Sequence, residues 1–143
     1  MPTEDAAHEP ARAPLAAAKQ DHRRALGSLG EDLAAAHLLR RGFRVLDRNV
    51  RTRHGEIDMI ACDERVLAFV EVKTLRARPG AAEPQPLAGL GWAQRKRLRR
   101  LAGAWLAREQ ARPRVQTLRF DAIGVVLDER GRLLRLDHLE GAW

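Results

Sequence analysis

The sequence has one cysteine, no tyrosine and three phenylalanines among its 143 residues. Cys62 has no second thiol with which to form an internal disulfide, which favours a reducing compartment. Aromatic platforms on which single-stranded bases could stack are sparse, with Trp92 as the candidate for such stacking and Trp105 predicted in the core. The sequence also lacks a glycine-rich phosphate loop, which argues against nucleotide hydrolysis of the P-loop type.

Long apolar runs are missing as well. No segment approaches the roughly 18 apolar residues that span a bilayer. Residues 1–20 contain Glu4, Asp5 and Glu9 and have no continuous apolar centre, unlike a secretory signal. We therefore expect a cytoplasmic protein without a membrane partner.

Positive charge is abundant and localised. The formal net charge is +7 and the isoelectric point is about 11, which favours polyanionic partners such as nucleic acid. Between residues 92 and 114, eight basic residues face one acidic residue, Glu109, so this segment alone carries the net charge of the whole chain. The eight are Arg95, Lys96, Arg97, Arg99, Arg100, Arg108, Arg112 and Arg114.

Almost all the positive charge is arginine. Only Lys19, Lys73 and Lys96 are lysines among the 26 basic residues. Because an ammonium group and a guanidinium do different chemistry, a lysine kept inside a predicted strand is informative.

The predicted elements form one domain over residues 21–143, preceded by a mobile tail over residues 1–20 that is rich in proline and alanine. Helical periodicity predicts helices over 21–41 and 90–111, the second with Leu98, Leu101, Ala102 and Trp105 inward. Strands are predicted over 43–50, 56–62, 66–73, 117–127 and 133–136, and a mobile loop over 74–89. This order predicts an α/β fold with a mixed central sheet of about five strands flanked by helices.

Acidic and basic side chains gather in two neighbouring predicted strands. Alternation along 66–73 puts Glu71 and Lys73 on one face at the end of an apolar strand, where burial is costly unless charges are paired or meet a metal. In the strand over 56–62, Ile57, Met59 and Ala61 share one face, and Asp58 lies on the other. A hairpin between these strands lets Asp58 and Glu71 converge.

Two carboxylates side by side make a hard oxygen site that suits Mg²⁺ or Mn²⁺. Such an ion polarises a phosphodiester and lowers the pKa of bound water, and Lys73 can position that water. The alternative is a structural ion pair between Glu71 and Lys73 on an exposed strand edge. The apolar run before Glu71, the second acidic strand and the rarity of lysine favour the metal site.

Five short motifs follow one another along the chain: Gly30-Glu31, Gly55-Glu56-Ile57-Asp58, Phe69-Val70-Glu71-Val72-Lys73-Thr74, Arg119-Phe120-Asp121 and the closing His138-Leu139-Glu140-Gly141-Ala142-Trp143. In this order they resemble the YraN-like family of small bacterial proteins, which is placed in the PD-(D/E)XK (restriction-endonuclease-like) nuclease superfamily. The resemblance covers roughly residues 24–143.

The resemblance implies a restriction-endonuclease-like sheet and a metal-dependent endonuclease. Asp58 and Glu71 look like the metal ligands, Lys73 like the catalytic lysine, and Glu31 like the helix glutamate that joins the metal shell in some members. Ile57 stands where the superfamily motif has proline, at a position that often varies. Some members have lost catalysis, and many act as dimers, so a homodimer is compatible with the resemblance.

The basic helix is predicted to bind the nucleic-acid backbone. DNA is favoured over RNA, and branched DNA is among the candidate substrates. The predicted contacts are Gln94, Arg95, Lys96, Arg99, Arg100 and His54. Two other interpretations stay open: a nucleic-acid-binding module in recombination or repair without catalysis, and a basic docking face for an acidic protein.

Overall fold

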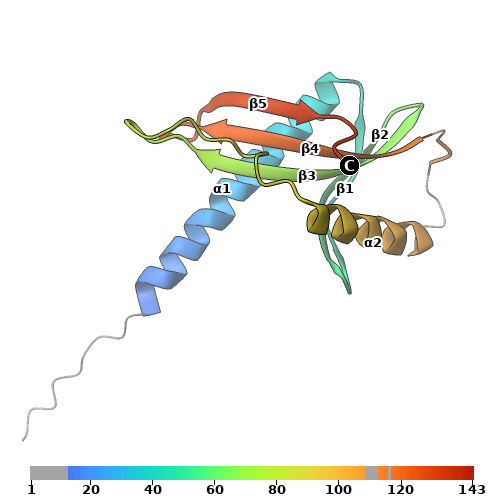
Figure 1. The fold of residues 1–143 in the computed structure, drawn as a ribbon, viewed down its shortest axis with the longest axis horizontal. Helices are drawn as coiled ribbons and strands as arrows, with labels where there is room; N and C mark the ends of the chain where they lie inside the picture. Colours follow the sequence, from blue (N-terminus) through green and yellow to red (C-terminus); the bar gives the residue numbers. More distant parts are fainter. Residues whose placement is uncertain (1–12, 109–112, 116) are drawn as a thin grey trace, which may run out of the picture.

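A computed structural model describes residues 13–108, 113–115 and 117–143 of the chain. Two helices and five strands follow one another in the order helix, three strands, helix, two strands, as predicted (Figure 1). They are α1 (Ala13–Arg40), β1 (Arg44–Thr52), β2 (Gly55–Cys62), β3 (Val66–Arg76), α2 (Trp92–Arg108), β4 (Thr117–Leu127) and β5 (Leu133–Leu139).

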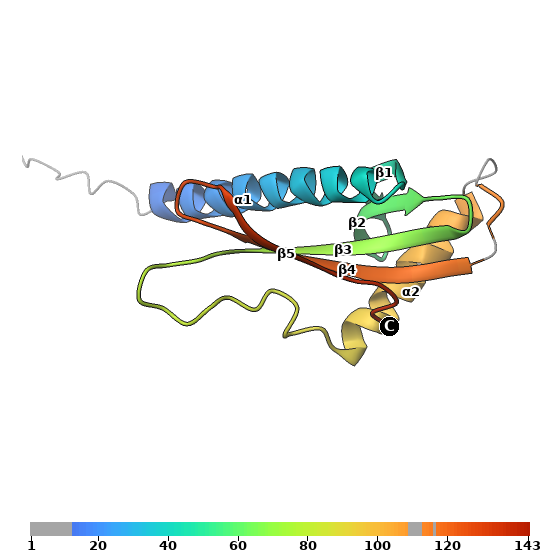
Figure 2. The ribbon, with the colours of Figure 1, turned by 90° about the horizontal axis from the view of Figure 1, so that it is seen from above.

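The five strands form one mixed sheet in the spatial order β1-β2-β3-β4-β5. Antiparallel pairs join β1 to β2, β2 to β3 and β4 to β5, whereas β3 and β4 run parallel. A parallel pair needs a crossover connection, and α2 provides it. Helix α1 lies along one face of the sheet, and α2 covers part of the other (Figure 2). The predicted fold class is confirmed.

Several element ends differ from the prediction. Helix α1 begins at Ala13, so residues 13–20, which the sequence assigned to the tail, are helical. Strand β3 continues to Arg76 and β5 to Leu139, because each stays paired with β4 along its whole length. Residues 1–12 of the predicted tail and 109–111 of the predicted second helix lie outside the described residues.

Each face of the sheet has its own apolar core. The α1 face packs Ala34 and Leu38 against strand residues such as Val70. The α2 face buries the predicted stripe of Leu98, Leu101, Ala102 and Trp105. None of the described helices is both long enough and apolar enough to cross a membrane.

The inward stripe of α1 is made partly of small residues. Leu29 is exposed, whereas Gly30, Ala34 and Leu38 are buried one turn apart. Small residues at 30 and 34 let the helix backbone approach the sheet. A Cβ added to Gly30 would overlap Oγ1 of Thr74 and lie 2.8 Å from its Cβ, so only glycine fits between α1 and β3.

The segment after β3 packs on the sheet rather than standing away from it. Ala77 N–H donates to the Leu127 carbonyl at 2.8 Å, and Arg135 donates to the Pro84 carbonyl at 2.7 Å. Leu87 lies so close to Gly124 of β4 that an added Cβ would be 2.9 Å from its Cγ. The segment therefore covers the part of the α2 face that α2 leaves open (Figure 2).

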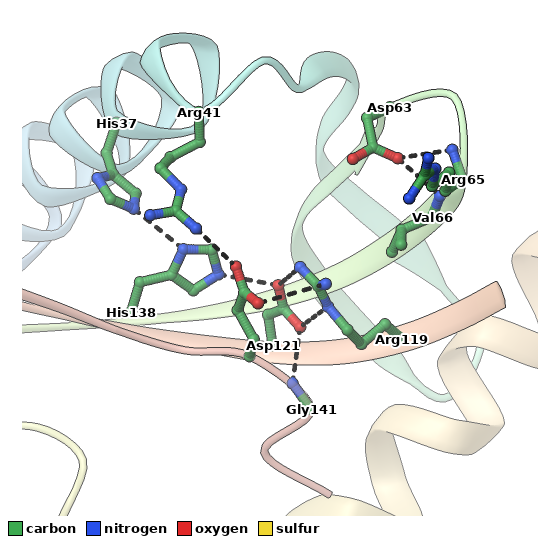
Figure 3. A network of polar contacts seen from close by, with 10 residues as sticks. His37, Arg41, Asp63, Arg65, Val66, Arg119, Asp121, His138 and Gly141 are labelled. Atoms are coloured by element: carbon green, nitrogen blue, oxygen red, sulfur yellow. Dashed lines mark hydrogen bonds and ion pairs between the residues drawn. The ribbon is translucent and has the colours of Figure 1, made fainter.

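A buried ionic network ties the end of α1 and the C-terminal turn to β4 (Figure 3). Asp121 is fully buried and accepts two hydrogen bonds of 2.8 Å from Arg119, one from His138 at 2.8 Å and one from Gly141 N–H at 3.1 Å. His37 Nε2 lies 3.0 Å from His138 Nδ1. Burial alone would raise the pKa of Asp121, but the donors outweigh it and the pKa is lowered.

Substituting Gly30 by alanine should force α1 away from β3. We expect the Gly30→Ala variant to lose about 1–3 kcal/mol of unfolding free energy, the usual cost of overpacking. Urea unfolding measures it. Gly27→Ala is the matched control, because nothing lies within 4 Å of a Cβ at Gly27 and alanine favours a helix. Equal stability of the two variants would contradict the close approach.

Removing the Asp121 carboxylate should take away the buried acceptor that Arg119 and His138 share. We expect Asp121→Ala to lose about 3–5 kcal/mol of unfolding free energy. The control is Asp137→Ala, since Asp137 also pairs with an arginine two residues earlier, at 2.9 Å, but is half exposed; its loss should stay below about 1 kcal/mol. Because the folded pKa of Asp121 is lowered, its contribution holds above pH 3.8 and is lost as the pH falls below that value.

Candidate active site

The pairing of β2 with β3 stops in the middle of the sheet, at Met59 and Val70. One step further in the same register, Asp58 would stand opposite Glu71. Instead, Asp58 Oδ2 accepts a hydrogen bond of 2.8 Å from Val72 N–H, so a side chain takes the place of the next backbone partner. Beyond this point β2 stays paired only with β1, and β3 only with β4 (Figure 1). We call the place where β2 and β3 separate "the fork".

Asp58 is largely buried at the fork and its charge is poorly compensated. Desolvation raises its pKa, the hydrogen bond from Val72 N–H lowers it, and the neighbouring charges of Glu71 and Glu31 raise it further. The pKa reaches about 7. Three carboxylates from two strands and α1 therefore influence one another at this point.

Glu71 is held by two cations. Its side chain is 7% exposed, and Lys73 Nζ lies 3.1 Å from its Oε1. Arg97 of α2 donates to both of its oxygens, at 3.2 and 3.3 Å. Both side chains share one carboxylate, so positive charge from β3 and from α2 meets beside Asp58.

Glu31 reaches the fork from the α1 side. Its pKa is raised by burial, and a hydrogen bond with Asn49 and the charge of Arg48 oppose this. Asn49 has a positive φ of 51°, a left-handed conformation that asparagine tolerates better than most residues. Its neighbours Arg48 and Val50 pair with Met59 and Ile57 of β2, so Asn49 lies across from Asp58.

The predicted alternation along β2 is wrong at its first member. Met59 and Ala61 pack in the α1 core, as a shared face requires, but Ile57 belongs to the α2 core. The change of face occurs at Asp58, across from the left-handed Asn49. A local change of backbone conformation of this kind cannot be read from the apolar pattern.

Within residues 13–108, 113–115 and 117–143, no three His, Cys, Asp or Glu side chains form a group that could hold a metal. Mg²⁺ needs fewer protein ligands, since it takes one or two carboxylates and keeps several waters. Asp58 and Glu71 supply hard oxygens, and the negative charge around Asp58 is incompletely neutralised. The residues therefore fit an ion held by two carboxylates and water, with Glu31 beyond direct reach.

The predicted nucleic-acid contacts on α2 are spread around the helix. Arg99 and Arg100 are exposed, and Lys96 lies over the ring of Trp92 at 5.1 Å. Gln94 instead accepts a hydrogen bond of 3.3 Å from Gly91 N–H at the start of the helix.

Arg95 is half-buried, and His54 lies exposed in the β1–β2 turn, 3.2 Å from Arg53 Nε.

Sequence reasoning missed two residues of the site. Arg97 enters the sequence analysis only as part of the basic segment, although it lies one turn before Leu101, at the edge of the inward stripe, and could have been placed near the sheet. Asn49 gave no usable signal, because its role depends on a backbone angle.

Together, these features define a mixed α/β domain with a carboxylate and lysine cluster where two central strands part. The family described as "Uncharacterised protein family UPF0102" matches residues 30–125. The chain belongs to this family, the one named above as YraN-like.

Relatives match over most of their length. A UPF0102 protein of Mycobacterium avium is 45% identical over 81% of this chain and 88% of the relative. Those of Syntrophotalea carbinolica and Nocardia farcinica are each 41% identical, over 85% and 88% of this chain and 93% and 94% of the relatives.

Neutralising Asp58 should stabilise the metal-free protein. The folded pKa is about 7 against 3.8 for the unfolded chain, so the native state binds more protons between these values and stability falls as the pH rises through them. In chelator, Asp58→Asn should be about 1–3 kcal/mol more stable than the parent above pH 8, with the gain vanishing towards pH 4. Unfolding curves against pH measure this. The control Asp21→Asn, at an exposed aspartate, should show no gain in stability. If Asp58→Asn also shows no gain, the Asp58 charge is not poorly compensated.

Proposed function

We propose that this protein is a divalent-metal-dependent endonuclease of the PD-(D/E)XK superfamily that acts on DNA in the cytoplasm. The observation that carries the proposal is the meeting of Asp58, Glu71 and Lys73 at the fork. Two buried carboxylates with an ammonium group 3.1 Å from one of them suit phosphodiester hydrolysis better than a structural ion pair, which needs no second carboxylate.

Asp58 and Glu71 would hold Mg²⁺ or Mn²⁺, and Glu31 would contact the ion through water. When bound, the ion supplies Lewis-acid polarisation of the phosphate and a more acidic water. The protein contributes two carboxylates that are largely shielded from solvent. Because the carboxylates are fixed by β2 and β3, their positions do not depend on loop closure.

Lys73 is the group placed to assist the attacking water. Its side chain is partly exposed while its Nζ contacts Glu71, so it connects the buried carboxylate with incoming substrate. An ammonium group can orient the water and offset the charge that develops on the phosphate. Arg97 adds a second positive charge at the same carboxylate.

The start of α2 would hold the nucleic-acid backbone beside the site. Arg97 anchors this part of the helix to Glu71, and the exposed Arg99 and Arg100 are its neighbours. Contacts of this kind with phosphate are sequence-independent and weaken with salt.

A cleavage assay tests the proposal. Purified protein is incubated with duplex, flap, four-way-junction and single-stranded DNA in Mn²⁺ or Mg²⁺. We expect cleavage of at least one substrate, with Asp58→Ala and Lys73→Ala each lowering the rate by about 10²–10³, as for the loss of one group that stabilises the transition state. Arg132→Ala, at an exposed arginine of the turn between β4 and β5 and away from the carboxylates and from α2, is the control and should keep the cleavage rate.

Cleavage that survives both substitutions would contradict the assignment of the active site to Asp58 and Lys73. Absence of metal-dependent cleavage on every substrate would refute the nuclease assignment.

A second candidate is a nucleic-acid-binding module without catalysis. The observation that favours it is the double pairing of Glu71 with Lys73 and Arg97, which satisfies this carboxylate without a metal. This candidate predicts salt-sensitive DNA binding that survives Glu71→Gln, together with no cleavage by the parent protein.

A further inference from the structure

A second basic surface reaches the fork from the α1 side. A cleft of about 920 Å³ lies between α1 and the far half of β3, and both Glu31 and Lys73 are among its lining residues. It therefore opens onto the candidate site from the face opposite α2.

The cleft is strongly basic. Lys19 and Arg23 line it from α1, one helical turn apart, and Arg76 and Arg78 line it from the end of β3 and the residues that follow. With Lys73 these make five permanent cations, against one carboxylate, Glu31. Two of the three lysines of the chain lie here.

Three of the five cations are available to a ligand, whereas Lys73 pairs with Glu71. Lys19, Arg23 and Arg78 are exposed. Arg76 donates a hydrogen bond of 3.0 Å to His22 Nε2, which ties β3 to α1 across the cleft.

The open side of β3 forms the floor. After Val70, no strand among the described residues pairs with β3 on the side facing β2, and Asp58 takes the N–H of Val72. By strand alternation, the backbone groups of Thr74 and Arg76 point to the same open side. The floor of the cleft thus adds backbone donors to the cationic side chains.

We propose that this cleft binds the sugar–phosphate backbone of a single nucleic-acid strand and leads it to Lys73 and Glu31. The inference rests on the proposed function only in taking nucleic acid as the ligand. It adds a path to the site that the basic segment of the sequence did not predict, because Lys19 and Arg23 lie far from that segment.

The dimensions favour one strand over a duplex. The wall from Lys19 to Glu31 is roughly 18 Å long at 1.5 Å per helical residue, which spans up to about five nucleotides at 3.4 Å or more per nucleotide. A duplex accepts convex elements such as helices into its grooves, whereas this surface is concave. Few aromatic side chains line it, so the grip is on phosphates and is independent of sequence.

Binding of a short fluorescein-labelled oligothymidylate, followed by fluorescence anisotropy in chelator over a range of salt, tests the inference without any need for cleavage. The cleft variant is Lys19→Gln/Arg23→Gln/Arg78→Gln. We expect at least a tenfold rise in Kd near physiological salt and a fall of about 2 in the slope of log Kd against log salt, since each phosphate contact contributes about 0.7 on a single strand.

The matched control removes the same charge elsewhere. Arg24→Gln/Arg40→Gln/Arg132→Gln changes three exposed arginines that do not line the cleft. The slope of log Kd against log salt for this variant should differ from that of the parent by no more than about 0.7, the contribution of one phosphate contact.

A charge-conserving variant, Lys19→Arg/Arg23→Lys/Arg78→Lys, should bind like the parent. If the cleft variant does not fold, Arg23→Gln and Arg78→Gln are measured singly, each with an expected slope change of about 0.7.

The outcomes separate this inference from the proposed function. Loss of binding in an Arg99→Gln/Arg100→Gln variant together with normal binding in the cleft variant would overturn the cleft and leave the nuclease proposal intact. Cleft-dependent binding by a parent protein that cuts no substrate would support the cleft and refute the nuclease. A parent protein that binds only duplex, or no DNA, would overturn the inference.

Discussion

The parting of β2 from β3 after Met59 and Val70 is the constraint on which the candidate site depends. In a continuous sheet, the helices on its two faces would be separated by an unbroken layer of backbone. At the fork that layer is open, so Glu31 from the α1 face and Glu71 from the α2 face both act on Asp58. Gly30 contributes by letting α1 approach Thr74 directly, one residue from Glu31.

Two aspartates within the same sheet have opposite electrostatic environments. Asp121 has an arginine, a histidine and a backbone N–H as donors, and its pKa is lowered. Asp58 is close to two other carboxylates and its pKa is raised. Burying charge in this second way costs stability, and a cation from outside the chain would relieve that cost. The contrast lies in the partners, since both aspartates lie on strands within the sheet.

The elements and the central cluster follow from sequence patterns, but their environment does not. The long apolar run of β3 and the stripe of α2 are strong periodic signals, and a tight hairpin fixes the register that brings Asp58 near Glu71. The face change at Asp58 depends on the left-handed Asn49, and the pairing of Arg97 with Glu71 depends on how α2 docks on the sheet. The cleft along α1 escaped prediction because Lys19 was assigned to a tail and β3 was ended before Arg76. Each miss concerns three-dimensional docking or a backbone angle, which local propensity does not encode.

A crystal structure with Mn²⁺ and its anomalous difference map tests the central claim most directly. A divalent ion at the fork predicts an anomalous peak at coordination distance from both Asp58 and Glu71, with Arg97 displaced from Glu71. A map without a peak there at saturating Mn²⁺, in crystals where Glu71 still binds Lys73 and Arg97, would contradict a metal site at the fork.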